Sequence, residues 1–466
     1  MNFKVRSLVA ATLAGSMLMG FGVNAMADST TDIVNALVAK GVLTDEEGAL
    51  LTKGRTDEAA GQAKALKKAS KLKVSDAIDN ATVYGDIRVR AEYRDGKNDA
   101  EVKEERQRGR YKLTLGVKTD ASDFYTDLAL AMGAGGRSDN ATFAGAATNG
   151  GNEKEDILVK RAMIGYKATD WLTLEAGRIA NPLYTTPMVW DGDLTFEGLA
   201  EMVKYKVGPA DIFLTAVQTQ YLGDRKTFTT NGVPGGGTDR ATSEVFAFQA
   251  GTKFAITDDV NAKAAITYTT YGSKGSTNFK PLRPTDTYAV STTGTNDLRT
   301  LEIPAEINFK LSGNLGVKVY GDYAVNLDGT DRYNAAVAAT TAGAARTAIA
   351  AAGNDDKAWL LGMELASKSG KSAQKGDWSA AVWYQNVGVY ALDQNAVDSD
   401  FMDSRVNMKG IVLKTAYNIR DNVVMNFAAG HSTRKNDALS TAGAAADIAL
   451  DLNKYNLYQL DLTYKF

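Results

Sequence analysis

The chain of 466 residues contains no cysteine and a single histidine, His431. Without cysteine it can form neither a disulfide nor a thiolate metal site. If the segment around His431 is a strand, its neighbour Ser432 projects to the opposite face, so the two cannot form a catalytic dyad. The acidic residues also lack the spacing of a calcium-binding loop. We therefore expect a protein that is not an enzyme and that holds no metal or cofactor.

Long apolar runs are also missing from most of the chain. After the first 27 residues, no segment approaches the roughly 18 consecutive apolar residues that a transmembrane helix requires. A location in a membrane would then require a closed β-barrel, which satisfies its backbone hydrogen bonds within the sheet.

The first residues have the pattern of an export signal. Lys4 and Arg6 precede an apolar stretch that ends at Ala25-Met26-Ala27. This predicts a signal peptide over residues 1–27, with an uncleaved membrane anchor as the alternative. Its removal would leave 51 basic and 55 acidic side chains, a balance too mild to indicate a nucleic-acid partner.

Residues 28–78 have a helical pattern instead. Apolar residues recur at helical spacing in "TTDIVNALVAKGVLTDEEGALL", and Thr44 with Glu47 forms a capping box. The lysine-rich stretch "AKALKKASKLK" follows. We expect an α-helical or coiled segment in the periplasm that packs or oligomerises there. Contact of its lysines with a membrane surface or the cell wall is the alternative.

From Thr82 onward the apolar residues recur at every second position. In "VYGDIRVRAEYR", Ile87 and Val89 alternate with Arg88 and Arg90, and sixteen such segments follow one another to the end of the chain. Short turns such as "VGPAD" alternate with long loops such as 223–242, 273–298 and 328–354. Residues 79–466 are therefore predicted to form an outer-membrane β-barrel of about 16 antiparallel strands. Only Pro304 falls inside a predicted strand, where proline is least expected.

The last segment, "NLYQLDLTYKF", alternates up to its final residue. A barrel closes by pairing its last strand with its first, so this strand cannot fray without exposing an unpaired edge to lipid. The tail resembles the terminal signature by which the bacterial barrel assembly machinery recognises outer-membrane proteins. We assign Tyr464 and Phe466 as the assembly signal, with that machinery and outer-membrane lipid as partners.

Sixteen strands leave a water-filled lumen, which predicts passive diffusion of small hydrophilic solutes or ions. The first two strands carry basic residues on one face. On the lipid side each charge would cost about 2–4 kcal/mol, so this face must line the pore. It comprises Arg88, Arg90, Arg94, Arg108, Arg110 and Lys112. Such a face would attract anions. The alternative is a cross-strand ladder that pairs with acidic residues elsewhere in the lumen and sets no selectivity.

Several motifs resemble the bacterial putative porin family. They are "GDIRVRAEYR", the arginine-rich second strand, "GRIANPLY" and "VWDGDLTFEGLA", between about residues 80 and 210. The helical prefix is also similar to that of phosphate-selective porins. The resemblance implies a porin without naming its solute. A structural or adhesive barrel that acts through its extracellular loops is the alternative function.

Porins of sixteen strands resemble one another in folding the loop after the fifth strand into the channel. In this chain the loop contains Trp190, Asp191, Asp193 and Glu197, which could form an acidic constriction with an aromatic shoulder. The alternative is that Asp191-Gly192-Asp193 is only a turn and Trp190 an interfacial anchor. The same resemblance implies a homotrimer.

Overall fold

The computed structural model describes Thr44 and residues 77–133, 138–144, 154–222, 243–272, 298–339, 342–368, 373–437, 439–441 and 447–466. The predicted signal peptide and nearly all of the predicted helical segment 28–78 lie outside the described residues, as do the loops 223–242 and 273–297.

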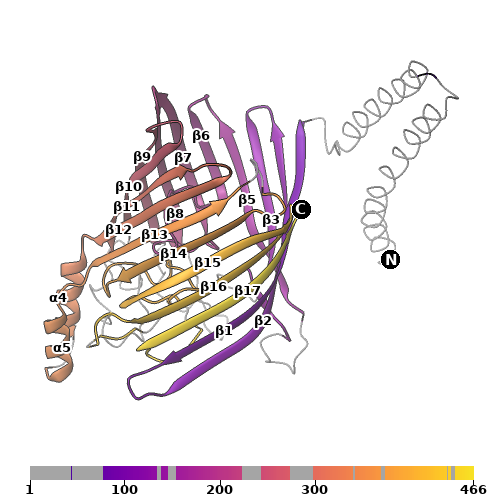
Figure 1. Cartoon of the computed structure of the whole chain (residues 1–466). Helices are drawn as coiled ribbons and strands as arrows, with labels where there is room; N and C mark the ends of the chain where they lie inside the picture. Colours follow the sequence, from indigo (N-terminus) through magenta and orange to yellow (C-terminus); the bar gives the residue numbers. More distant parts are fainter. Residues whose placement is uncertain are drawn as a thin grey trace, which may run out of the picture. The chain divides into compact units, whose positions relative to one another are not determined.

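The described residues form one closed antiparallel β-sheet of seventeen strands (Figure 1). Sixteen of them are long, and the two-residue strand β4 is an extra strand. The strands are β1 (Asn80–Lys97), β2 (Lys103–Ala121), β3 (Phe124–Gly133), β4 (Ala141–Thr142), β5 (Asp156–Lys167), β6 (Leu172–Ala180), β7 (Thr195–Val207), β8 (Ala210–Leu222), β9 (Ser243–Ala255), β10 (Val260–Gly272), β11 (Arg299–Lys310), β12 (Leu315–Asn326), β13 (Lys357–Ser367), β14 (Trp378–Val387), β15 (Met408–Arg420), β16 (Val423–Arg434) and β17 (Lys454–Lys465). The predicted sixteen-strand barrel is confirmed.

The barrel closes where β17 pairs with β1. The register runs from Asp86 opposite Lys465 to Lys97 opposite Lys454. Phe466 continues the ladder beyond β17, because its backbone N–H donates to the Gly85 carbonyl at 3.1 Å and its carbonyl accepts from the Gly85 N–H at 2.9 Å. The hydrogen-bonded pairing of β17 with β1 therefore continues as far as Phe466.

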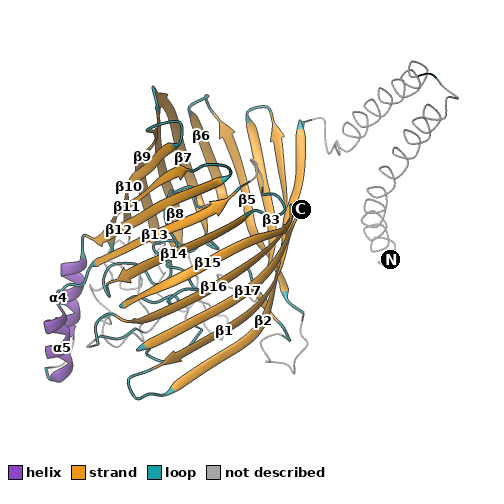
Figure 2. Cartoon of the chain, viewed as in Figure 1, coloured by secondary structure: helices purple, strands orange, loops and turns teal. Residues whose placement is uncertain are grey.

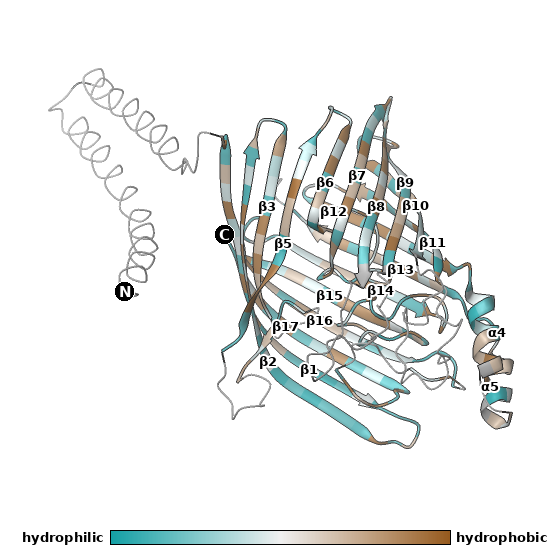
Figure 3. Cartoon of the chain, turned by 180° about the vertical axis from the view of Figure 1, so that it is seen from behind, coloured by the Kyte–Doolittle hydropathy of each residue, from teal (hydrophilic) through white to brown (hydrophobic). Residues whose placement is uncertain are grey.

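The two faces of each strand differ as the alternation predicts. On β1, the outward side chains Ile87 and Val89 are each 47% exposed, whereas the inward Arg90 is 5% exposed. Hydrophobic and hydrophilic bands alternate along the strands in Figure 3. An apolar outer face and a polar inner face suit lipid outside and water inside.

Most strands are joined by short turns at one end of the barrel, which we call the short-turn end, and by longer connections at the other, the long-loop end. The connection of β1 to β2 at the long-loop end, residues 98–102, is short as well. The connection between β12 and β13 contains two helices, α4 (Gly329–Ala339) and α5 (Ala344–Ala352) (Figure 2). The sequence predicts only a loop there. The segment is rich in alanine, the strongest helix former, which accounts for the difference. In the described part of the chain, no helix has the length and apolar character needed to cross a membrane.

Pro304 lies inside β11, as predicted. The pairing of β11 with β12 is continuous through Pro304, which is opposite Asp322. The pairing with β10 is interrupted, because it passes from Ala305 directly to Glu302. Proline lacks the N–H that a ladder needs, so one side of the strand has a gap.

Four aromatic rings near the short-turn end lie over glycines on the neighbouring strand. A Cβ atom on Gly251 would lie 2.2 Å from Cζ of Phe213, and one on Gly362 would lie 2.5 Å from Cζ of Tyr320. Each glycine is directly opposite its aromatic residue in the register. The other two pairs are Tyr84 with Gly116 and Tyr125 with Gly165. The missing side chain leaves room for the ring to lie against the sheet.

Candidate functional site

The loop 181–194, between β6 and β7, folds into the barrel and contacts the opposite wall. The Thr185 hydroxyl donates to Glu302 of β11 at 2.5 Å, and the Thr186 hydroxyl donates to Asp322 of β12 at 2.5 Å. Both carboxylates are buried, at 1% and 3% exposure. The loop is therefore tied to the opposite wall by hydrogen bonds to two buried acidic side chains.

A second loop, 388–407 between β14 and β15, folds inward and contacts the first. The N–H of Asp191 donates to the Ala396 carbonyl at 2.6 Å, and Asp191 Oδ2 accepts from the Ser399 N–H at 2.9 Å. The N–H of Asp398 donates to the Pro187 carbonyl at 3.1 Å. Together the two loops narrow the lumen.

The loops share an apolar cluster that excludes Trp190 from the open lumen. Trp190 is 7% exposed and packs edge-on against Phe196, with ring centroids 5.2 Å apart. Val389, Leu392 and other residues of the second loop belong to the same buried cluster. Trp190 thus lies in packed protein, where it anchors the loop.

The six basic residues predicted to line the pore lie on the inner face of β1 and β2, but with like charges opposite one another. Arg90 is opposite Arg110, and Arg88 is opposite Lys112. Like charges directly across a strand pair are destabilising unless acidic groups lie between them. We call this set of six residues the arginine face.

Acidic residues from three other segments neutralise the centre of the arginine face. Arg94, which is 1% exposed, forms ion pairs with Asp400 at 2.9 Å and Asp403 at 3.0 Å, both from the second loop. Asp447 accepts from Arg108 at 2.5 Å. Two further pairs join Arg90 to Asp461 of β17 at 2.7 Å and Arg94 to Glu92 at 3.0 Å.

The remaining members of the arginine face have weaker or neutral partners. Arg88 hydrogen-bonds Asn140 and lies 3.7 Å from Asp461. Arg110 donates to the Ser138 hydroxyl at 3.0 Å. Lys112 has carboxylates at 3.7 and 3.8 Å, from Asp86 and Asp139. Every member therefore has at least one polar partner.

The four residues predicted to form an acidic constriction do not gather at one point. Trp190 and Asp191 lie at the contact between the loops, and Asp191 Oδ1 accepts from the Asp193 N–H at 2.9 Å, which is the geometry of a tight turn. Asp193 and Glu197 line a separate cavity of about 250 Å³ with Arg178. Glu197 forms an ion pair with Arg178 there.

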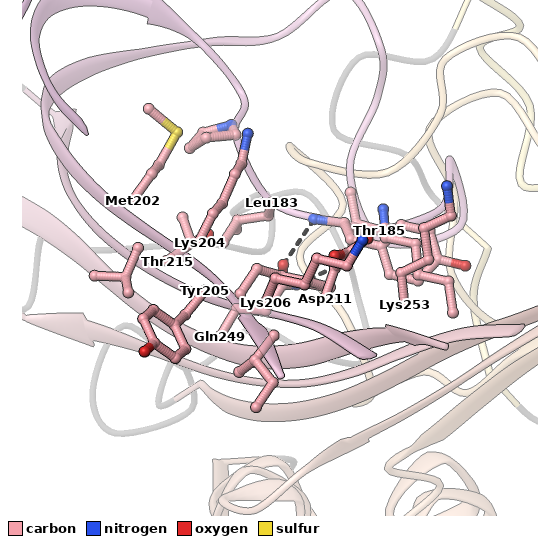
Figure 4. Close-up of a pocket in the computed structure, with 16 residues that line it drawn as sticks. Leu183, Thr185, Met202, Lys204, Tyr205, Lys206, Asp211, Thr215, Gln249 and Lys253 are labelled. Atoms are coloured by element: carbon pink, nitrogen blue, oxygen red, sulfur yellow. Dashed lines mark hydrogen bonds between the residues drawn. The ribbon is translucent and has the colours of Figure 1, made fainter. Parts of the chain in front are cut away.

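Two larger cavities flank the tip of the first loop, and Tyr184 and Thr185 line both. One, of about 610 Å³, lies between the loop and β7 to β10 (Figure 4). We call it the lysine cavity; its charged and aromatic wall consists of Lys204, Lys206, Asp211, Phe213, Lys253 and Lys263. The other, also of about 610 Å³, reaches the arginine face and has a balanced wall of four basic and four acidic side chains, namely Arg88, Arg90, Lys318, Lys414, Glu306, Glu364, Asp400 and Asp461.

Two acidic residues of the second loop have shifted pKa values in opposite directions. Burial raises the pKa of Asp398 to about 6, opposed by Lys414 and reinforced by the carboxylates of Asp400 and Asp191. Burial would also raise the pKa of Asp400, but the guanidinium groups of Arg90 and Arg94 hold it below its ordinary value. Asp398 thus titrates closer to neutral pH than an exposed aspartate does.

The sequence prediction missed the second loop, the lysine cavity and the hydroxyl contacts of Thr185 and Thr186. A signal for the second loop is present in "DQNAVDSDFMDSR", an acidic stretch between two predicted strands. Six inward basic residues require nearby carboxylates in a low-dielectric lumen, and this stretch could supply them. Among the described residues, no group of three or more histidine or acidic side chains is arranged to hold a metal ion.

Several solved structures have a similar fold. The chain is similar to OprB of Pseudomonas putida, with 12% identity, a TM-score of 0.47, and coverage of 82% of this chain and 94% of OprB. It is similar to the channel DcaP of Acinetobacter baumannii, with 14% identity, a TM-score of 0.44, and coverage of 84% and 99%. It is also similar to an anion-selective porin from Comamonas acidovorans, with 10% identity, a TM-score of 0.44, and coverage of 83% of this chain and 99% of that porin. No curated protein matches the chain in sequence.

The family comparison covers most of the barrel. A model described as "putative porin" matches residues 92–296 and 278–454. These matches include both inward loops and every long strand from β2 to β16. By this match the chain belongs to the putative porin family, whose resemblance the motifs of its first strands had already indicated.

Proposed function

We propose that the barrel is a passive diffusion channel for small hydrophilic solutes that favours anions over cations. The channel itself follows from the family and the fold: the protein is an outer-membrane porin. The anion preference is supported by one observation, the excess of basic side chains in the lysine cavity, where four lysines stand against Asp211. Fixed positive charge on the wall of a narrow pore raises the local concentration of anions.

The arginine face contributes less to this preference than the sequence alone predicts. Its central members are paired with acidic residues at 2.5 to 3.1 Å. A paired charge in the wall produces a weak field at the pore axis, since the field of its partner opposes it. The lysines of the lysine cavity, which form no such close pair with a described carboxylate, therefore supply the positive potential.

Selectivity is tested by recording single channels in planar bilayers across a KCl gradient. We expect a reversal potential with the sign of anion preference, which shrinks as salt rises because the screening length falls from about 10 Å at 0.1 M to about 3 Å at 1 M. A reversal potential with the sign of cation preference would overturn the proposal. Folded protein that never conducts would favour the structural or adhesive alternative.

The family and the fold point to a channel rather than an enzyme, and we propose that the protein has no catalytic role. His431 is exposed on the outside of β16, while Ser432 is fully buried, so the two lie on opposite faces. Incubation with ester and phospholipid substrates, which outer-membrane hydrolases cleave, should give no turnover above that of an empty bilayer.

We further propose that the mature chain begins after residue 27, that residues 28–78 form a periplasmic segment, and that the barrel assembles as a homotrimer. The export pattern, the helical periodicity and the resemblance to sixteen-stranded porins support these three points in turn. N-terminal sequencing of the outer-membrane protein tests the first. Protease accessibility in intact and lysed cells tests the second, and native mass measurement in detergent tests the third.

A further inference from the structure

We propose that the lysine cavity is a binding site for small organic carboxylates. The carboxylate would lie among the lysine side chains and the apolar body against Phe213 and the loop residues Leu183 and Tyr184. The inference rests on the proposed anion preference and gives it a location and a class of solute.

The four lysines of this cavity are not held in close ion pairs with the described carboxylates. Lys253 lies directly opposite Lys263 in the register of β9 and β10, a pairing of like charges that is unfavourable in itself. On their other sides Lys253 is opposite Asp211 and Lys263 is opposite Glu306, so two acidic residues lie near four lysines and the balance stays positive. Among the described residues, no carboxylate forms an ion pair with Lys204, Lys206, Lys253 or Lys263. On the neighbouring wall, by contrast, Lys318 pairs with Glu364 at 2.7 Å. The cavity thus differs from the arginine face, where acidic residues already occupy the positions of an anion.

Part of the cavity wall next to the lysines is aromatic and aliphatic. The Lys263 ammonium lies 3.7 Å from the Tyr184 ring centroid and 5.3 Å from the Phe213 ring centroid. Leu183 completes this wall. Cationic groups beside apolar side chains fit a carboxylate with an apolar body better than they fit a hydrated inorganic ion, and about 610 Å³ lies in the usual range for small-molecule sites.

The loop side of the cavity is fixed before any ligand arrives. Gln249 of β9, which is 3% exposed, accepts from the Tyr184 N–H at 2.9 Å and donates to the Tyr184 carbonyl at 2.8 Å. Gln249 also donates to the Thr267 hydroxyl at 2.7 Å. Figure 4 draws the hydrogen bonds between the labelled Gln249 and the loop as dashed lines. A site whose walls are already ordered loses less entropy on binding.

Solutes can reach the cationic wall from water. Lys204, Lys206 and Lys253 are exposed and lie close to the short turns that join β7 to β8 and β9 to β10. The ring of Phe213 lies over Gly251, two residues from Lys253 on the same strand. The site is therefore open toward the short-turn end of the barrel and bounded by the loop on its other side.

Benzoate block of single-channel current tests the site, with benzamide as the neutral probe of the same shape. We expect benzoate to block the wild-type channel, benzamide to block it at least tenfold more weakly, and Lys204→Gln with Lys253→Gln to weaken the benzoate block about tenfold, because two of the nearest positive charges are lost. The control is Lys368→Gln with Lys375→Gln, which removes the same charge from an exposed turn between β13 and β14.

Each outcome supports or overturns the site. Equal block by benzoate and benzamide, or equal block in the cavity and control variants, overturns it, even if KCl reversal potentials retain an anion preference. A tenfold loss confined to the cavity variant supports the site, even if the wild type is unselective for KCl. If the cavity variant fails to fold, the ratio of benzoate block to benzamide block is compared at low and high salt in the wild-type channel. A ratio that falls at high salt supports the site and an unchanged ratio overturns it, because only a charge-dependent site loses that ratio at high salt.

Discussion

At the scale of single residues, Arg94 illustrates how a buried charge holds the lumen together. Its guanidinium lies between carboxylates of β1 and of two loops, among them Glu92, Asp403 and Asp447 at 3.0 to 3.1 Å. Removal of one partner from a buried ion cluster leaves the other charges uncompensated, which costs more than the pair contributes. The main contribution of the arginine face is therefore to the stability of the barrel.

Replacing Arg94 with Gln should destabilise the barrel by about 3–5 kcal/mol, because several buried carboxylates lose their counter-charge. The measurement is the temperature at which the fast-migrating folded band disappears from unboiled gels. Lys375→Gln, on an exposed turn, is the control and should leave this temperature unchanged. A variant with wild-type stability and a shifted reversal potential would instead assign selectivity to the arginine face.

The second prediction concerns Asp398 and pH. Its folded pKa of about 6 lies above its unfolded value, so the native state binds the extra proton between about pH 4 and pH 6. The contact between the two loops should therefore be most stable at the acidic end of this window and weaken as pH rises through about 6. Asp400, with its pKa held low, changes charge only at more acidic pH.

Single-channel recordings at about pH 5 and pH 7 check this, because a loosened loop contact produces current flicker. We expect more flicker at pH 7. Asp398→Asn resembles the protonated acid in shape and charge, so it should remain quiet at both pH values. If the Asp398→Asn variant flickers with the same pH dependence as the wild type, another titrating group controls the loop contact.

At the scale of elements, the first loop depends on two hydroxyl groups. Thr185→Ala with Thr186→Ala removes the donors to Glu302 and Asp322, and a hydrogen bond within a protein contributes about 0.5–1.5 kcal/mol. We expect a larger and noisier conductance. The matched control, Thr185→Ser with Thr186→Ser, keeps both hydroxyls and should behave as the wild type. Identical conductance in the alanine and serine variants would mean that the apolar cluster alone holds the loop.

The strands were predictable from the sequence and the loop contacts were not. Outer residues such as Val89 must be apolar in lipid and inner ones such as Arg90 polar, so the constraint is local and appears as a period of two. The Arg94 to Asp400 pair joins residues 306 positions apart, and no local pattern records it. The turn at Asp191 could be expected from its Asp-Gly-Asp sequence, but its contact with Ser399 depends on where the second loop folds.

At the scale of the whole molecule, closure at β1 and β17 determines whether a barrel exists. Deletion of Phe466 removes two backbone hydrogen bonds to Gly85 and the ring that lies 2.7 Å from the position of a Cβ there. We expect severalfold less folded barrel in the outer membrane, while the channels that do assemble conduct normally. Lys465→Gln, at an exposed neighbouring position, is the control. Normal membrane levels after the deletion would show that the tail has no role in assembly.

The aromatic rings that lie over glycines have a consequence for the electrical resistance of the pore. Phe213 and Tyr320 lie against the wall because Gly251 and Gly362 have no Cβ beneath them. An alanine at either glycine would push its ring away from the wall and reduce the cross-section through which ions move. The resistance of the short-turn half of the channel is therefore controlled in part by residues without a side chain, which themselves project nothing into the lumen.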